Sequence, residues 1–114
     1  MHELGVMMEV LKVVEQCAEE NGVTKVETLV LQIGELSSVL PEFIEELYPI
    51  VAEGTILENT KLEIEVLPGN ALCRGCGKVF NIMKNDGTCP VCSSTNWEQL
   101  GGREFNIKEI ICSD

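Results

Sequence analysis

The sequence predicts an α+β fold, in which a small mixed β-sheet with two helices is accompanied by an inserted, cysteine-rich domain. Three observations indicate this fold. Two segments carry apolar residues at helical spacing, residues 61–67 alternate as a strand does, and four of the six cysteines lie between residues 73 and 92. A strand-like segment follows these cysteines, so we expect both ends of the chain to contribute to one sheet.

The first half of the chain contains two helical patterns separated by a strand pattern. Apolar residues three and four positions apart predict a helix over residues 4–20, and Gly22 supplies a stop signal. Residues 25–33 are rich in Val, Leu and Ile and predict a strand. Pro41 opens a second helix that runs to about residue 53, because proline suits the first helical turn.

Two later segments predict the remaining strands of the sheet. Residues 61–67 place apolar side chains on one face and two glutamates on the other. Residues 104–112 are also strand-like, but their apolar pattern changes face after Ile107. This last segment is therefore expected to be a strand that is either buried on both sides or interrupted by a bulge.

Charge is unevenly distributed along the 114 residues, whose formal net charge is −11. Residues 1–68 carry 14 acidic and 3 basic side chains, whereas residues 69–114 carry five of each. The composition changes near Pro68. We therefore expect residues 1–68 and 101–114 to form an α/β body, with residues 69–100 as a separate inserted domain.

The composition also argues against several classes of partner. An acidic chain of this kind is a poor ligand for nucleic acid and for anionic membranes, because both carry negative phosphates. No apolar run approaches the roughly 20 residues that span a bilayer. The N-terminal segment has neither a basic region nor a small-residue cleavage site. We expect a cytoplasmic protein, in which paired thiols bind metal before they form disulfides.

The most specific motif is a pair of C-x2-C sequences. Cys73 and Cys76 form the first pair, Cys89 and Cys92 form the second, and 12 residues separate them. Two such turns can face each other around a tetrahedral cation, so we expect four zinc ligands in a zinc-ribbon-like domain. Zinc would supply the folding free energy that so short a segment cannot obtain from its own core. Residues 78–87, between the pairs, predict a hairpin.

Other uses of these cysteines are less well supported. The two cysteine pairs of rubredoxin-type iron sites are separated by a much longer stretch of sequence, and a redox dithiol would require a thioredoxin-like βαβ context. A site with four thiolates leaves no open coordination position, and the chain has no convincing acid/base or nucleophile constellation, so we do not expect an enzyme. Cys17 and Cys112 lie outside both pairs and are expected to be buried apolar thiols.

The only histidine, His2, is the second candidate metal ligand. Its imidazole, its amide nitrogen and the Met1 amine can close two adjacent chelate rings on one metal, and the amide or carboxylate of Glu3 can add a fourth donor. Such nitrogen-rich sets suit Ni(II) or Cu(II), with Cu(II) favoured on affinity alone. The alternative is a solvated terminal histidine, and nothing in the composition selects nickel.

Further motifs extend this pattern over essentially the whole chain. They are Met1-His2-Glu3, Ile33-Gly34-Glu35-Leu36-Ser37, Val39-Leu40-Pro41-Glu42, Gly54-Thr55, Leu62-Glu63-Ile64, the two C-x2-C pairs, Gly102-Arg103-Glu104 and Ile107-Lys108-Glu109-Ile110. Together they resemble the HypA/HybF family, the nickel-incorporation proteins of hydrogenase maturation.

This resemblance implies a nickel metallochaperone that works with a HypB-type GTPase to load Ni(II) into the [NiFe]-hydrogenase large subunit. It assigns nickel to His2, Glu3 and the Met1 amine, and structural zinc to the four paired cysteines. Some family members also serve urease maturation, and the sequence does not decide whether this one does. The alternative is a zinc-ribbon adaptor or scaffold protein with no nickel-transfer role of its own.

The chain departs from some relatives in its histidine content. Those relatives have histidines beside the zinc cysteines, whereas this chain has no histidine after His2. A switch of zinc ligation that depends on histidine is therefore excluded here. Any further nickel ligand must be a backbone group, a carboxylate, water or a group from another protein.

Overall fold

A computed structural model describes residues 3–112, and its elements confirm the α+β fold. In chain order they are α1 (Glu3–Glu20), β1 (Val26–Gly34), α2 (Pro41–Ala52), β2 (Lys61–Leu67), β3 (Asn70–Cys73), β4 (Val79–Asn81), the 3-10 helix η1 (Met83–Asn85), β5 (Trp97–Gln99) and β6 (Phe105–Cys112). Both helices and the three longer strands lie within two residues of the bounds that the sequence predicts.

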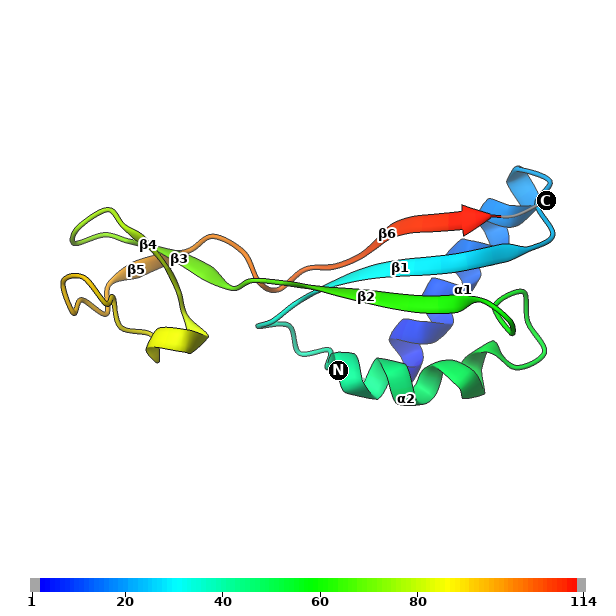
Figure 1. The fold of residues 1–114 in the computed structure, drawn as a ribbon, viewed down its shortest axis with the longest axis horizontal. Coiled ribbons are helices and arrows are strands. Elements are labelled where there is room, and N and C mark those ends of the chain that lie inside the picture. Colours follow the sequence, from blue (N-terminus) through cyan, green and yellow to red (C-terminus); the bar gives the residue numbers. More distant parts are fainter. Residues whose placement is uncertain (1–2, 113–114) are drawn as a thin grey trace.

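The two helices and three strands form one packed unit, which we call the body. Its sheet has the order β2-β1-β6, with β1 parallel to β2 and antiparallel to β6, so the sheet is mixed as expected. Both helices cover the same face of this sheet (Figure 1). Leu29, Leu31 and Ile33 of β1 alternate onto that face and are completely buried. The central strand therefore anchors the core against which α1 and α2 pack.

A bulge explains the irregular apolar pattern of β6. The pairing of β1 with β6 changes register between Val30, which faces Glu109, and Leu31, which faces Ile107. This shift leaves one extra residue in β6, so Ile107 and Ile110 both pack against the core. Of the two expectations for this segment, the bulge is confirmed. Burial on both sides is wrong, because several side chains of β6 are exposed.

The remaining strands form a second unit, which we call the cysteine module. Its sheet has the order β4-β3-β5 and is antiparallel. The hairpin expected over residues 78–87 does not form: β4 pairs with β3, and η1 follows β4 directly. Asp86, near the end of this segment, ends η1 in the left-handed conformation at φ +50°.

A narrow neck joins the cysteine module to the body, and the molecule measures 54 × 24 × 17 Å (Figure 1). Two chain segments cross this neck, from β2 to β3 and from β5 to β6, and the turn that follows β1 packs against them. Each of these three segments contributes a glycine: Gly69, Gly102 and Gly34. A Cβ added to Gly102 would lie 2.6 Å from the Cα of Gly69, and one added to Gly34 would overlap the carbonyl of Gly102. The three backbones approach so closely because none of these residues has a side chain.

We expect Gly102→Ala to destabilise the protein by about 2 kcal/mol, because overpacking adds to the strain of a side chain at φ +110°. Gly5 provides a matched control within α1, since a Cβ there would meet no atom within 4 Å. Gly5→Ala should stabilise the protein by about 0.5–1 kcal/mol. Chemical denaturation measures both changes, and a neutral Gly102→Ala variant would contradict the close packing of the neck.

Candidate metal centre

The four paired cysteines meet at the end of the cysteine module. Cys73 ends β3, Cys76 follows it in the first cysteine loop, and Cys89 and Cys92 belong to the second loop, before β5. Their sulfur atoms all lie within 4.8 Å of one another. The separation is 3.5 Å between the sulfurs of Cys73 and Cys92, and 3.6 Å between those of Cys76 and Cys89.

These distances fit the expected cation. Zinc bonds to thiolate sulfur at about 2.3 Å, so the sulfurs of a tetrahedral site lie roughly 3.8 Å apart. Four soft sulfur ligands in a tetrahedral arrangement favour zinc, with iron as the other metal of this geometry. The cluster is therefore a four-cysteine site suited to zinc. It offers the metal no open position for a substrate.

The two cysteine loops have matching backbone geometry. In the first, the N–H of Cys73 donates to the carbonyl of Lys78 at 2.8 Å, and the N–H of Gly77 donates to the carbonyl of Cys73 at 2.9 Å. Cys89 and Ser93 repeat both bonds in the second loop, at 2.9 Å each. Gly77 and Ser93 also share a positive φ, +76° and +63°. Each loop thus turns both of its thiols toward the same point.

The four thiols do not ionise independently. The backbone N–H of Cys76, assisted by the Cys92 thiol, stabilises the Cys73 thiolate and lowers its pKa to about 6. At Cys92 the N–H of Ser94 also lowers the pKa, but contact with Cys73 and burial outweigh it and raise the pKa to about 12. A bound dication relieves this competition, because zinc keeps all of its thiol ligands deprotonated.

The core of the cysteine module is too small to hold this arrangement by itself. Its buried residues are Ala71, Cys73, Phe80 and Cys89. Trp97 adds an edge-on contact with the Phe80 ring, at a centroid distance of 6.3 Å, and donates its indole N–H to the carbonyl of Gly87 at 2.8 Å. Two of these four buried residues are cysteines of the cluster, so the metal site forms part of the module's core.

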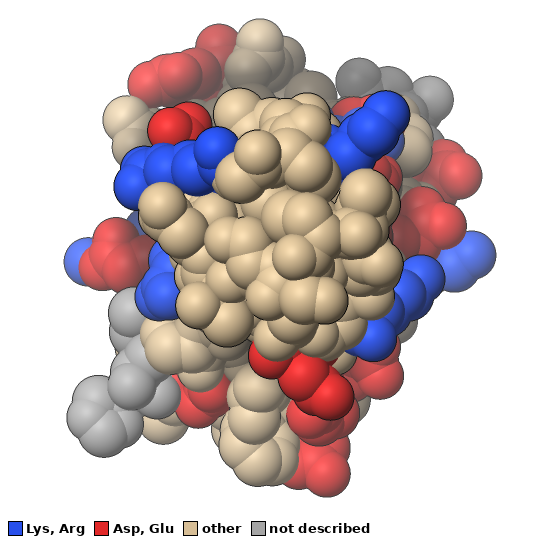
Figure 2. Space-filling view, turned by 90° about the vertical axis from the view of Figure 1, so that its left-hand side faces the viewer, with Lys and Arg blue, Asp and Glu red and all other residues tan. Residues whose placement is uncertain are grey.

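The outer end of the cysteine module is largely uncharged. Figure 2 shows this end of the molecule, with uncharged residues at its centre, lysine and arginine side chains beside them and acidic side chains below. Val79 and Val91 of the module are 57% and 63% exposed. The acidic side chains instead belong mainly to residues 1–68. The charge asymmetry of the sequence is thus an asymmetry between the two ends of the molecule.

The other cysteines lie outside the cluster, as expected, but neither is fully buried. Cys17 is half-buried on α1, where the side-chain amide of Asn21 lies 3.6 Å from its sulfur. Cys112 is exposed, so its expected burial is wrong. The bulge in β6 turns Ile110 toward the core, and Cys112, two residues later, lies at the exposed end of the strand.

The second candidate site lies at the start of the chain. Met1 and His2 fall outside the described residues, and Glu3 is the first residue of α1. The Glu3 carboxylate accepts a hydrogen bond from the backbone N–H of Leu40 at 3.4 Å. Leu40 is the N-cap of α2 and has no side-chain cap of its own. Glu3 therefore brings the beginning of α1 to the beginning of α2.

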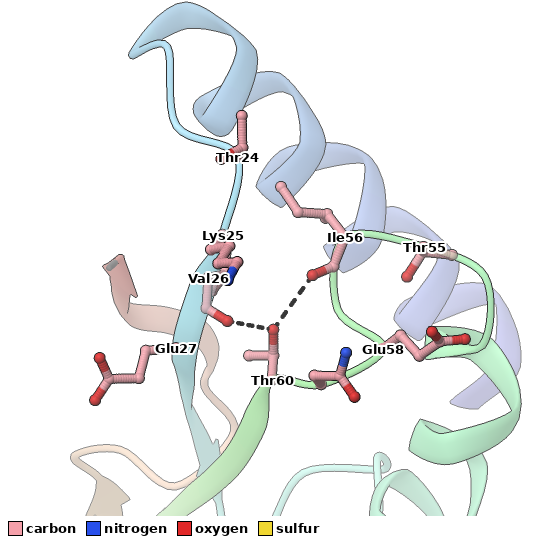
Figure 3. A pocket seen from close by; sticks show the side chains of 9 residues that line it. Thr24, Lys25, Val26, Glu27, Thr55, Ile56, Glu58 and Thr60 are labelled. Carbon is pink, nitrogen blue, oxygen red and sulfur yellow. Dashed lines mark hydrogen bonds between the residues drawn. The ribbon is translucent and has the colours of Figure 1, made fainter. Parts of the chain in front are cut away.

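One hollow of the described surface lies in the body, far from the four paired cysteines. It has a volume of about 370 Å³ and lies between the start of β1 and the loop that precedes β2 (Figure 3). The Thr60 hydroxyl spans this loop by donating to the carbonyl of Val26 at 2.6 Å. The residues that line the hollow include neither histidine nor cysteine. It therefore offers no nitrogen or sulfur ligand for a transition metal.

Fold and site together define a class: a small two-part α+β protein whose body carries a module with a four-thiolate metal site. The family described as hydrogenase/urease nickel incorporation, metallochaperone, HypA, matches residues 1–112. The chain belongs to this family.

None of the helices described is long and apolar enough to cross a membrane.

Individual relatives agree with this assignment. The hydrogenase maturation factor HypA of Dechloromonas aromatica is 37% identical over 110 residues, which cover 96% of this chain and 97% of the relative. The corresponding protein of Nostoc sp. is also 37% identical, over 96% of this chain and 94% of the relative.

Solved structures agree on the fold. The Ni metallochaperone HypA from Helicobacter pylori superimposes with a TM-score of 0.67 at 24% identity, over 98% of this chain and 97% of that one. A second HypA solution structure gives a TM-score of 0.70 at 25% identity, over 99% of this chain and 97% of that one.

Proposed function

We propose that this chain is a nickel metallochaperone that delivers Ni(II) for the maturation of [NiFe]-hydrogenase, with zinc as a structural ion. The observation that carries the proposal is the family match, which includes the Met1-His2-Glu3 motif as well as the four cysteines. Two metals are assigned to two chemically different sites. Soft thiolates suit zinc, and a set of terminal nitrogens suits nickel.

In this proposal nickel is bound by the Met1 amine, the His2 amide and imidazole, and Glu3. The contact between the Glu3 carboxylate and Leu40 favours the amide nitrogen of Glu3 as the fourth donor, because its carboxylate is already engaged. As the first residue of α1, Glu3 has an N–H that no carbonyl of the helix can accept. Nitrogen donors at the start of a helix are thus available without any loss of helical hydrogen bonds.

A site of this kind favours exchange over storage. Its donors come from three consecutive residues, so few groups enclose the metal. Ligands of a receiving protein can replace the donors one at a time, with no need to unfold the body. Zinc is held differently, by residues from two loops that fold around it, and we assign it no part in the transfer.

We assign the nickel site to residues 1–68 and 101–114, and the zinc site to Cys73, Cys76, Cys89 and Cys92 within residues 69–100. The proposed partners are a HypB-type GTPase and the large subunit of [NiFe]-hydrogenase, in the cytoplasm. The family description also includes urease, so urease maturation proteins are further candidates. The acidic surface of the body would favour partners with basic surfaces.

The test is transfer of nickel to a purified, nickel-free hydrogenase large subunit. Zinc-loaded protein carrying ⁶³Ni should pass the label to this subunit, whereas His2→Ala at the same total nickel should pass little. Glu27→Ala, which removes an exposed carboxylate in β1, serves as the control and should behave as the wild type does. Equal transfer by wild type and His2→Ala would refute the terminal site as the donor.

A further inference from the structure

Two of the family motifs have no role in either metal site, and both lie in the neck. Gly34 to Leu36 and Gly102 to Glu104 are joined there by backbone hydrogen bonds. The N–H of Gly34 donates to the carbonyl of Glu104 at 2.8 Å, and the N–H of Leu36 donates to that of Gly102 at 2.7 Å. The turn that follows β1 is thereby bound to the segment that returns from the module to β6.

Glu35 connects this pair of segments to the third segment and to the cysteine module. Its N–H donates to the carbonyl of Leu67 at 2.8 Å, and its carboxylate accepts the N–H of Gly69 at 2.8 Å. The same carboxylate oxygen accepts the side-chain amide of Asn81, on β4, at 2.6 Å. One side chain of the body thus binds both the linker and a strand of the module.

Asn81 is oriented for this contact by the module itself. Its amide oxygen accepts the N–H of Lys84 at 3.0 Å and so caps η1. Its backbone carbonyl accepts the side-chain amide of Asn85 at 2.8 Å. These bonds fix the oxygen within the module. The amide nitrogen points at Glu35 and also donates to the side-chain oxygen of Asn70 at 3.3 Å.

The Glu35 carboxylate is ionised in this setting. The N–H of Gly69, then the amide of Asn81, and to a lesser extent the charge of Lys84 hold its pKa below the usual range of a glutamate. Hydrogen bonds to an ionised acceptor are stronger than those between neutral groups. The contact is therefore retained at neutral pH.

A short stretch of chain connects the neck to a contact with the first described residue, Glu3. The turn at Glu35 continues through residues 37–39 to Leu40, whose N–H binds the Glu3 carboxylate. Val39 is buried in the core of the body, which fixes this connection. An uninterrupted path of ordered contacts therefore runs from the cysteine module through Glu35 to Glu3.

We propose that Glu35 is a positioning residue, which holds the cysteine module in one orientation on the body by binding Gly69 and Asn81 together. The neck has few other side chains to do this, because glycines occupy its closest contacts. The orientation sets how the two ends of the molecule meet a nickel-receiving partner. The link to a nickel-receiving partner rests on the proposed function, whereas the role of Glu35 in orienting the module does not.

Exchanging donor and acceptor tests the contact. Asn81→Asp places a second carboxylate against Glu35 and should release the module. In the double variant Glu35→Gln/Asn81→Asp, the new glutamine can accept from Gly69 and donate to the new aspartate, so the contact should be restored. Glu27→Gln, at the other end of β1, is the matched control for loss of a carboxylate.

Residual dipolar couplings of the zinc-loaded proteins provide the measurement. In the wild type, the control and the double variant, one alignment tensor should fit body and module together. In Asn81→Asp the module should require its own, weaker tensor, while its zinc content and amide shifts remain those of a folded module. A single common tensor in Asn81→Asp, or no recovery in the double variant, would overturn the positioning role.

Nickel transfer separates this proposal from the proposed function. Asn81→Asp should slow transfer to the hydrogenase large subunit without changing nickel affinity, and the double variant should recover the rate. Unchanged transfer by a variant with a released module would refute the link to delivery. A wild type that binds no nickel would refute the proposed function, and the couplings would still decide the role of Glu35.

Discussion

Replacing Cys73 with serine is expected to release zinc and unfold the cysteine module while the body keeps its fold. Cys73 is both a ligand of the proposed zinc site and one of four residues in the module's buried core. Structural zinc contributes on the order of 10 kcal/mol to such small domains, far more than so few buried side chains can supply. The body has a separate core and should remain intact.

Metal analysis and amide NMR measure this outcome. The variant should contain no stoichiometric zinc, and the amide signals of residues 70–99 should collapse to shifts typical of an unfolded chain. Cys112→Ser is the control, because Cys112 is exposed and lies outside the cluster. Full zinc content and a dispersed module spectrum in Cys73→Ser would show that the site is not structural.

Replacing His2 with alanine is expected to weaken nickel binding by at least about 10–100-fold. Removing a residue that only orients a metal ligand already lowers metal affinity by about this factor. His2→Ala removes the ligand itself. The imidazole closes one of the two proposed chelate rings. Zinc content should not change, because the four cysteines form a separate site.

Isothermal titration of Ni(II) into zinc-loaded protein measures the change. Glu9→Ala is the control, since Glu9 lies on an exposed part of α1, away from the chain start. Equal nickel affinities for wild type and His2→Ala would place nickel elsewhere in the protein.

Local sequence patterns were sufficient to predict most of the fold. The bounds of α1, α2 and β2 follow from apolar spacing, Pro41 and alternation, all of which act within a few residues. The hairpin expected over residues 78–87 was wrong, because the turn at Asp86 ends η1 and does not join two strands. β4 instead pairs with β3 across the first cysteine loop, and β3 lies outside residues 78–87.

Apolar spacing alone could not predict which side chains at the end of β6 are buried. The sequence allowed either a bulge or burial on both faces, and only the pairing with β1 decides between them. The single extra residue between Ile107 and Ile110 changes the face of every residue that follows. Cys112 lies two residues after Ile110, so this shift does not explain its exposure. It is at the end of the strand, opposite Val26 and beyond a second register change.

The four cysteines could be predicted as a cluster because their spacing is itself the geometric condition for a shared metal. The role of Glu35 could not, because its partners lie 34 and 46 residues away. The only signal in the sequence was that Glu35 belongs to one of the motifs shared with the family, between Gly34 and Leu36. Neither metal site gives this glutamate a role.

If the start of the chain binds nickel, blocking the Met1 amine should remove one of the nickel ligands. Ni(II) should be titrated into zinc-loaded protein with a free Met1 amine and into the same protein extended by a few residues before Met1. The extended protein should keep its zinc and its fold but lose high-affinity nickel binding. Equal nickel affinity in the two proteins would contradict nickel binding by the start of the chain.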